Sequence, residues 1–175
     1  MRIAEIKNLD IANGPGVRVS VFVSGCNRHC PGCFNEIAWD FNYGVQFDDS
    51  VLDSIRSLLS NEKIAGISIL GGEPFEIRNQ PGVASIIDMT KIEFPEKNIW
   101  CFTGYTIDEL LNSEVSTVFT QDVLSKVDVL VDGPFIQAQR NLMLQYRGSE
   151  NQRLIDVPET LKSSKVVLWK DDYSR

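Results

Sequence analysis

Hydrophobic and polar residues alternate between residues 17 and 23, where every second position is valine. This period of two is typical of a β-strand. Three compact apolar runs, each followed by a turn that contains glycine, predict three further strands. They lie at residues 66–70, 98–102 and 127–131. A fifth strand is expected at residues 165–169, and its flanking lysines favour a sheet edge.

Three other segments predict helices. In residues 48–59 the apolar positions recur every three or four residues, after a start rich in aspartate and serine. Residues 81–92 begin with proline, which is common in the first turn of a helix. Residues 106–111 form a shorter expected helix, with Asp108 and Glu109 near its positive end.

Strands that alternate with helices indicate an α/β fold, in which right-handed crossovers join parallel strands. The 175 residues are too few for eight βα units, which take about 250 residues. We therefore expect a partial (incomplete) βα barrel with a mostly parallel, curved sheet of roughly five or six strands. The length also predicts a single domain, residues 1–175.

In a parallel sheet, the loops at the carboxyl ends of the strands build the functional site. Four unusual loops fall at such ends. They are the cysteine-rich residues 24–35 and the glycine-containing turns at 71–74, 103–105 and 132–134. We expect these loops to converge in space, although they lie far apart in the sequence.

The most informative of these loops contains Cys26, Cys30 and Cys33, with the spacing C-x3-C-x2-C. Soft thiolates suit iron–sulfur clusters, and three in one short loop need little loop-closure entropy. Three thiolates can hold a 4Fe–4S cluster by three of its irons. The fourth iron then remains open to a ligand that is not protein, which makes it a site for chemistry.

Other interpretations of the cysteines remain open at this stage. Zinc normally takes four ligands, and His29 is a candidate fourth, although it directly precedes Cys30. A disulfide framework needs an oxidising compartment. Cys101 lies in the apolar run at 98–102, which favours a buried core thiol over a ligand.

Composition narrows the class of protein further. The hydrophobic fraction of 43% and the charged fraction of 23% are ordinary for a globular domain. Seventeen basic and twenty-four acidic residues give a net charge of −7, which argues against nucleic-acid binding. No apolar stretch approaches the ~20 residues of a membrane span. The polar start lacks a signal-peptide core, so we expect a cytoplasmic protein.

Two motifs together resemble those of the radical S-adenosylmethionine superfamily. One is the cysteine motif followed by the aromatic Phe34, and the other is Gly-Gly-Glu-Pro at 71–74, after the next predicted strand. Within that superfamily, residues 13–18, 131–135 and 146–153 look like those of the proteins that activate anaerobic ribonucleoside-triphosphate reductase. The resemblance extends from about residue 13 to residue 157, most of the chain.

The resemblance implies an oxidoreductase that uses a 4Fe–4S cluster and S-adenosyl-L-methionine. The reduced cluster would cleave the sulfonium to a 5′-deoxyadenosyl radical, which takes a hydrogen atom from a glycine of the partner, the reductase. The reductase then carries a glycyl radical. An electron donor is also required. The implied metal ligands are Cys26, Cys30 and Cys33, and no side chain is implied as a catalytic group, because the chemistry takes place at the cluster and its cofactor.

The implied cofactor-binding residues form two groups. Gly32 and Phe34 flank Cys33, where glycine permits close backbone approach and the ring offers an apolar face to adenine. Gly71 and Gly72 also permit close approach. Pro74 biases Glu73 toward an extended backbone, which would aim its carbonyl group at the methionine ammonium, and the Glu73 carboxylate is a second candidate partner for the same cation. The alternatives are core packing for Phe34 and an ordinary surface turn for residues 71–74.

Three roles and three rival functions stay open. His29 is a loop residue or tunes the cluster, Asp132 contacts a ligand or caps the next segment, and residues 147–153 order a buried loop or meet the partner.

One rival function is a small enzyme similar to 7-carboxy-7-deazaguanine synthase, acting on a heterocycle. The others are an activator of another glycyl-radical enzyme, such as pyruvate formate-lyase, and a non-catalytic iron–sulfur or zinc protein.

Overall fold

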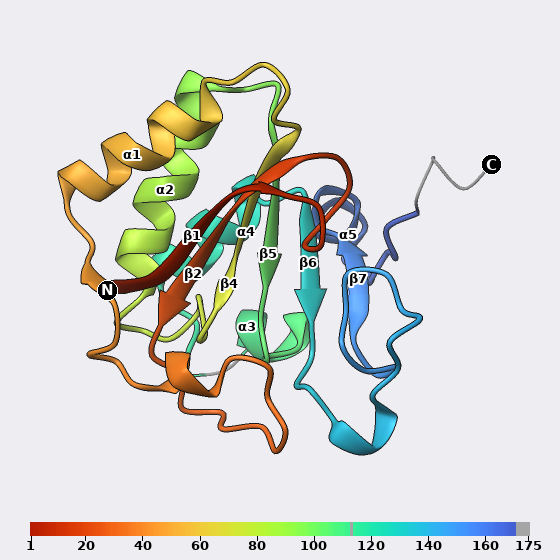
Figure 1. The fold of residues 1–175 in the computed structure, drawn as a ribbon. Coiled ribbons are helices and arrows are strands. Elements are labelled where there is room, and N and C mark those ends of the chain that lie inside the picture. The colour runs from red at the N-terminus through yellow and green to blue at the C-terminus, as the bar shows by residue number, and fades with distance from the viewer. Residues whose placement is uncertain (113, 171–175) are drawn as a thin grey trace.

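The computed structural model describes residues 1–112 and 114–170. Within them, one seven-stranded sheet has the order β3-β1-β2-β4-β5-β6-β7 (Figure 1). The strands are β1 (Arg2–Asp10), β2 (Arg18–Ser24), β3 (Val45–Gln46), β4 (Gly66–Gly71), β5 (Asn98–Phe102), β6 (Val129–Asp132) and β7 (Arg153–Asp156). The helices are α1 (Asp49–Leu59), α2 (Gln80–Glu93), α3 (Ile107–Asn112), α4 (Val118–Lys126) and α5 (Val157–Ser163), with short 3-10 helices η1 (Glu36–Trp39) and η2 (Gln137–Gln139).

The centre of the sheet is parallel and its flanks are antiparallel. Strands β2, β4, β5 and β6 run in the same direction, as the alternation of strands and helices predicts. Strand β1 pairs antiparallel with β2 because a short loop joins them, and a parallel pair needs a longer crossover. Strand β3 pairs antiparallel with β1, and β7 with β6. The α/β class and the parallel core are therefore confirmed, and the sheet is open.

The predicted edge strand at residues 165–169 is confirmed in position but not as a regular strand. Leu168 makes one antiparallel bridge to β7, the last strand of the sheet, and the Trp169 N–H donates to the Leu154 carbonyl oxygen at 2.8 Å. The segment therefore lies at the sheet edge but pairs over too few residues to form a strand. The Trp169 ring packs edge-on against Trp100, with ring centroids 4.9 Å apart.

Several elements were not predicted. Strand β1 buries only Ile3, so its hydrophobic signal is weak. Helix α4 and strand β7 lie in stretches that mix apolar and polar residues without a clear period. The predicted helices agree with α1, α2 and α3 to within one or two residues. Asp48 caps α1 by accepting a hydrogen bond from the Val51 backbone N–H, at 3.1 Å.

The two faces of the parallel core have different surroundings. Alternate residues of the core strands pack with α1, α2 and α4 in the main hydrophobic core, and they include Val21, Ile69 and Cys101. Residues of the opposite parity, Phe22, Leu70 and Phe102, line a cavity on the other face. The loops that follow β2, β4, β5 and β6 gather at one edge, at the bottom of Figure 1. No helix among the described residues is long and apolar enough to cross a membrane.

Candidate cluster and cofactor site

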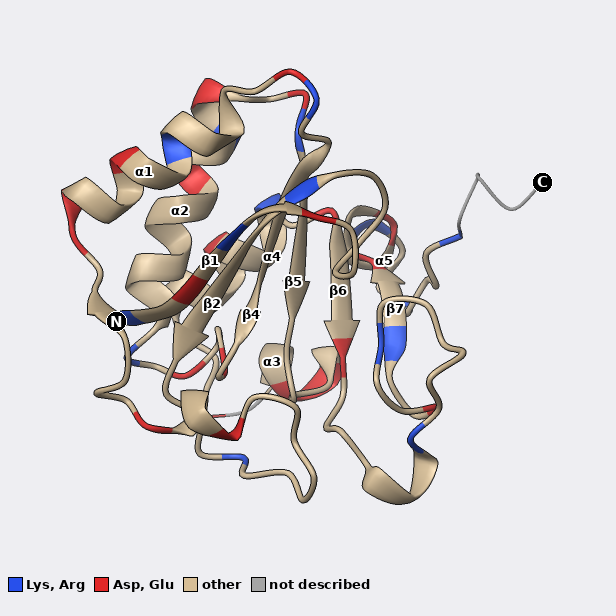
Figure 2. Ribbon diagram, in the orientation of Figure 1, with Lys and Arg blue, Asp and Glu red and all other residues tan. Residues whose placement is uncertain are grey.

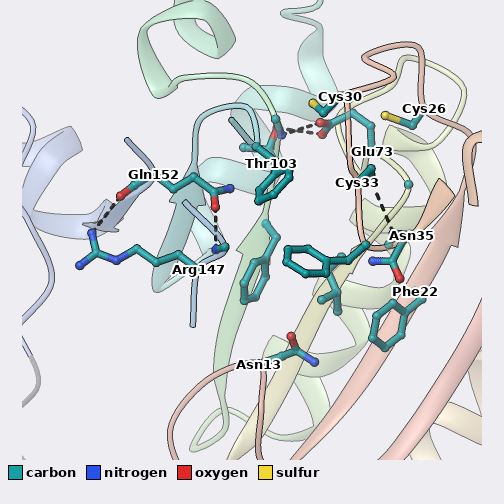
Figure 3. Close-up of a pocket in the computed structure, with 18 of the residues that line it drawn as sticks. Asn13, Phe22, Cys26, Cys30, Cys33, Asn35, Glu73, Thr103, Arg147 and Gln152 are labelled. Atoms are coloured by element: carbon teal, nitrogen blue, oxygen red, sulfur yellow. Dashed lines mark hydrogen bonds between the residues drawn. The ribbon is translucent and has the colours of Figure 1, made fainter. Parts of the chain in front are cut away.

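A cavity of about 540 Å³ opens at the carboxyl edge of the parallel strands. All four loops singled out in the sequence contribute to its wall, so their predicted convergence is confirmed. Figure 3 shows the three cysteines and Glu73 at one end of the cavity and Asn13 at the other. The wall between them is apolar, with Phe22, Leu70 and Phe102 among its residues.

The three clustered cysteines line this cavity as free thiols. Cys26 is buried, whereas Cys30 and Cys33 are partly exposed. A turn joins the last two through a hydrogen bond from Cys33 N–H to the Cys30 carbonyl oxygen, at 3.1 Å. The Asn35 N–H donates to Cys33 Sγ at 3.4 Å. Among the described residues, no three His, Cys, Asp or Glu side chains are gathered for a single metal ion; a cluster instead takes each thiolate on a separate iron.

The surroundings of Cys26 suit a metal-bound thiolate. Burial and, to a smaller extent, the nearby Glu73 and Glu76 raise the pKa of its thiol to about 11. The charged thiolate is therefore unfavourable unless a positive charge compensates it, and bound metal ions supply such a charge. Three soft donors on one cavity wall thus fit an iron–sulfur cluster.

Cys101 lies on the other face of the sheet. It is fully buried in the main hydrophobic core, and burial raises its pKa far above the ordinary value. It does not line the cavity. The interpretation of Cys101 as a core thiol is confirmed.

Gly71 and Gly72 bring the end of β4 against the end of β2. Gly71 has a φ of +108°, and a Cβ atom there would lie 2.6 Å from the Val23 carbonyl oxygen. A Cβ on Gly72 would lie 2.7 Å from the Gly25 carbonyl oxygen. Only glycine fits both positions without a shift of the backbone. The Gly72 carbonyl oxygen accepts no hydrogen bond from the part of the chain that the structure describes.

Glu73 is buried, and its polar atoms already have partners. One carboxylate oxygen accepts hydrogen bonds from Phe75 N–H at 2.9 Å and Thr103 Oγ1 at 2.8 Å, and the other accepts one from Gly104 N–H at 2.7 Å. Its carbonyl oxygen accepts hydrogen bonds from Asn79 Nδ2 at 2.9 Å and Glu76 N–H at 3.1 Å. Burial raises the pKa of its carboxyl group to about 7. Glu73 therefore ties the loop after β4 to the loop after β5, and its direct contact with a cofactor stays a prediction.

The residues that flank Cys33 differ in their positions. Phe34 lines the cavity, and because its side chain is 58% exposed it is not a core residue. Its ring tilts against Phe135, with centroids 5.1 Å apart, and the Arg140 guanidinium lies 5.1 Å from its centroid. Gly32 lies outside the cavity lining, and its Cα faces the Gln137 side chain. The cofactor-binding roles of Gly32, Cys33 and Phe34 stay predictions.

The hydrogen-bond partners of Asp132 indicate a structural role. It is fully buried, and its carboxylate accepts hydrogen bonds from Arg153 Nε at 2.9 Å and Nη2 at 2.5 Å. It also accepts one from the Ile107 N–H at 2.8 Å, at the start of α3. In Figure 2, acidic colour at the end of β6 lies next to basic colour on β7. Asp132 does not line the cavity, so capping of the neighbouring segment is the role that the geometry supports.

Residues 147–153 order the cavity wall opposite the cysteines. Arg147 donates from Nη1 to the Gln152 carbonyl oxygen at 2.9 Å. Gln152 accepts from Gly148 N–H at 2.8 Å and donates to the Gly133 carbonyl oxygen at 3.1 Å. Arg147, Gly148 and Gln152 all line the cavity. This stretch therefore forms an ordered loop of the site, the first of its two expected roles.

Sequence reasoning missed several residues of the cavity, among them Asn13, Trp39 and Tyr146. The sequence did contain a signal for Phe22 and Phe102. Side chains alternate between the two faces of a strand, and these two residues have the opposite parity to the residues that the helices cover. Trp39 had no such signal, since it lies on η1, after the cysteine loop. His29 is exposed, lies outside the lining and stacks on Trp39, with ring centroids 4.6 Å apart.

Comparisons with known proteins agree with this geometry. The family model described as a 4Fe-4S single cluster domain matches residues 12–155. An anaerobic ribonucleoside-triphosphate reductase-activating protein of Salmonella typhi is 39% identical over 154 residues, which cover 87% of this chain and 96% of that protein. The protein of that name from Escherichia coli (strain K12) is 40% identical over 146 residues, covering 82% and 91%.

A viral relative extends the similarity to nearly the whole chain. The anaerobic ribonucleoside-triphosphate reductase-activating protein of Enterobacteria phage T4 is 35% identical over 174 residues, covering 98% of this chain and 100% of that protein. The similarity thus includes the cysteine loop, the Gly-Gly-Glu-Pro turn and the ordered loop opposite them. The chain belongs to the family of anaerobic ribonucleoside-triphosphate reductase-activating proteins, with a 4Fe-4S single cluster domain.

Proposed function

We propose that this chain activates an anaerobic ribonucleoside-triphosphate reductase by generating a glycyl radical on it. The observation that carries the proposal is the cavity in which three cysteines face the Gly71–Gly72 backbone, in a chain that matches the activating proteins over most of its length. When bound, a 4Fe–4S cluster and S-adenosylmethionine supply reductive cleavage of the sulfonium, and the resulting 5′-deoxyadenosyl radical removes a hydrogen atom from a glycine of the reductase. The partner follows from the similarity to relatives that activate this reductase.

In this proposal, the residues of the chain bind the cluster and the cofactor and orient them. Cys26, Cys30 and Cys33 hold the cluster, and the Asn35 N–H lowers the negative charge on the Cys33 sulfur. Gly72 lines the cavity together with the cysteines, and its unused carbonyl oxygen is the acceptor for the methionine ammonium. Glu73 acts through the backbone, because its own oxygens hold the two loops together.

Three further points, on the fold, the cavity wall and the cellular compartment, also belong to the proposal. The open sheet, with helices on one face and the cavity on the other, supports a partial βα barrel that acts as a single domain. The cavity is bounded by Phe22, Leu70 and Phe102, whose apolar side chains exclude water from a reactive radical. We place the protein in the cytoplasm with a separate electron donor, because clustered free cysteines suit a reducing compartment.

The test begins with Cys30→Ala, assayed without oxygen. Loss of one of three ligands should abolish both the bound iron and sulfide and the release of 5′-deoxyadenosine from S-adenosylmethionine. Cys101→Ala is the matched control, because it removes a thiol from the core and leaves the cavity intact. Retained cleavage in Cys30→Ala would refute the ligand assignment.

The partner is tested separately. Reduced protein, S-adenosylmethionine and a purified anaerobic reductase should give a carbon-centred radical on the reductase, detected by electron paramagnetic resonance. A reductase variant with alanine in place of the acceptor glycine is the control. If the protein cleaves the cofactor but produces a radical only on another glycyl-radical enzyme, or on none, the choice of the reductase is wrong.

A further inference from the structure

A nearly buried carboxylate holds the chain where it leaves the first of the clustered cysteines. The Glu76 residue, which is 9% exposed, accepts hydrogen bonds on its two carboxylate oxygens from the Asn27 backbone N–H at 2.9 Å and from Asn27 Nδ2 at 3.0 Å. Asn27 directly follows Cys26 in the sequence. A carboxylate that accepts from both a backbone and a side-chain donor fixes the position and the orientation of the residue it holds.

The next two residues of the cysteine loop are anchored on other elements. The Arg28 guanidinium lies over the ring of Tyr105, in the loop after β5, at 4.5 Å from the ring centroid. His29 has a φ of +44°, which is uncommon for a residue with a side chain, and it stacks on Trp39 of η1. Such a backbone conformation persists where the surrounding structure holds it. Residues 27–29, the spacer between the first two clustered cysteines, are therefore held by three separate contacts.

The segment that contains Glu76 also contains the turn proposed to bind the cofactor. The Glu76 N–H donates to the Glu73 carbonyl oxygen at 3.1 Å, and the Glu73 N–H donates to the Gly25 carbonyl oxygen at 2.9 Å. The Asn79 side chain joins the same two segments, because its Nδ2 donates to the Gly25 carbonyl oxygen at 3.3 Å and to that of Glu73 at 2.9 Å. Protein contacts on both sides of Cys26 thus connect the cysteine loop to the turn after β4.

We propose that Glu76 is a positioning residue for the cluster, which acts by fixing Asn27 and so preforms the loop that carries the thiolates. This inference rests on the proposed function, which makes the three cysteines the cluster ligands. The spacer backbone faces one of these ligands: burial raises the pKa of the Cys26 thiol, and the N–H groups of Arg28 and His29 oppose that rise. A loop that is ordered on folding loses little further conformational entropy on binding, so it should retain the cluster longer.

The variant Glu76→Ala removes both acceptors of Asn27. Iron release from the loaded, oxygen-protected protein to a ferrous-iron chelator should become about tenfold faster, because two charge-assisted hydrogen bonds are lost. Glu76→Gln keeps one oxygen acceptor and should restore part of the retention. The matched control is Asp128→Ala, which removes a carboxylate that accepts the Ile99 N–H at 2.7 Å near the amino end of β5, outside the cavity lining. The control should unfold more easily and release iron at the wild-type rate.

A second measurement uses the protein without cluster, so it does not depend on activity. Hydrogen exchange at the Asn27 N–H, followed by nuclear magnetic resonance, should be slow in the wild-type protein and in the control, and fast in Glu76→Ala. If Glu76→Ala takes up no cluster, this measurement decides alone. Equal exchange rates in Glu76→Ala and wild type would overturn the inference.

The two measurements also separate the inference from the proposed function. Faster exchange with unchanged iron release would overturn the positioning role of Glu76, because the contact with Asn27 would then not affect the cluster ligands. If the wild-type protein binds a cluster but neither cleaves S-adenosylmethionine nor produces a radical, the proposed function is wrong, and the positioning role is still decided by the release and exchange rates.

Discussion

Two buried carboxylates tie together the loops at the carboxyl edge of the sheet, with different kinds of partner. Glu73, after β4, accepts hydrogen bonds from the neutral donors of Phe75, Thr103 and Gly104. Asp132, at the end of β6, is paired with the guanidinium of Arg153 and also accepts the Ile107 N–H. Glu73 is among the residues that line the cavity of the proposed cofactor site, and Asp132 is not.

The difference shows how each region responds to a change of charge. At Glu73, burial outweighs the neutral donors and a more distant Arg28, so the carboxyl group has a pKa of about 7. At Asp132, a cation compensates the charge directly, and loss of the carboxylate would leave Arg153 without that partner. The region around Glu73 is therefore sensitive to pH, and the region around Asp132 is sensitive to loss of one member of its ion pair.

The largest expected effect is that of Asp132→Ala. Removal of one member of a buried ion pair costs about 3–5 kcal/mol, and we expect about 3 kcal/mol because the Arg153 side chain is one-third exposed. The check is the free energy of unfolding from urea denaturation. Asp132→Asn retains an oxygen acceptor for the Ile107 N–H and should lose less. Equal losses in the two variants would show that the hydrogen bond from the Ile107 N–H contributes little, and a small loss in both would show that the ion pair contributes little.

Glu73→Gln should show an effect of intermediate size that depends on pH. The folded-state pKa of Glu73 is raised from 4.5 to about 7, so the folded protein binds the proton more tightly than the unfolded chain does. Wild-type stability should therefore fall as the pH rises from about 4.5 to about 7, by at most about 1.4 kcal/mol per pH unit. Glutamine cannot ionise, so the stability of the variant relative to wild type should improve across that range.

Unfolding of the two proteins without cluster, at pH 5 and pH 8, measures this difference. The amide also presents an N–H₂ group to a ring of donors, which costs about 1–3 kcal/mol at every pH. Only the slope with pH reports on the titration. Parallel pH profiles for the two proteins would contradict the raised pKa of Glu73.

The smallest expected effect is that of Thr103→Val. The substitution removes the hydrogen bond from the Thr103 hydroxyl to Glu73 and leaves the Tyr105 N–H without its acceptor. The expected loss is about 1–2 kcal/mol. Because the lost donor favoured the ionised form of Glu73, the pH-dependent fall in stability should shift to higher pH. A profile that moves to lower pH would mean that the hydroxyl does not stabilise the carboxylate.

Local sequence patterns predicted much of the fold. The valine alternation that corresponds to β2, the compact apolar runs of β4 and β5, and the capped start of α1 are short-range signals that the structure confirms. The weakly patterned β1 and β7 were missed, because a strand that is paired at a sheet flank needs few buried side chains of its own. The segment at 165–169 carried a strand pattern and does lie at the edge beside β7, but it makes a single bridge there while Trp169 packs on Trp100.

Local sequence specifies the spacing of Cys26, Cys30 and Cys33 and the paired glycines of the 71–74 turn, because ligand spacing and backbone freedom are properties of neighbouring residues. The surroundings of these residues could be read from the fold alone. The fold directs the Glu73 side chain to protein donors, leaves Asp132 outside the cavity lining and brings Trp39 into that lining. Such roles depend on which groups from distant segments meet, and that is set by the packing of the whole sheet.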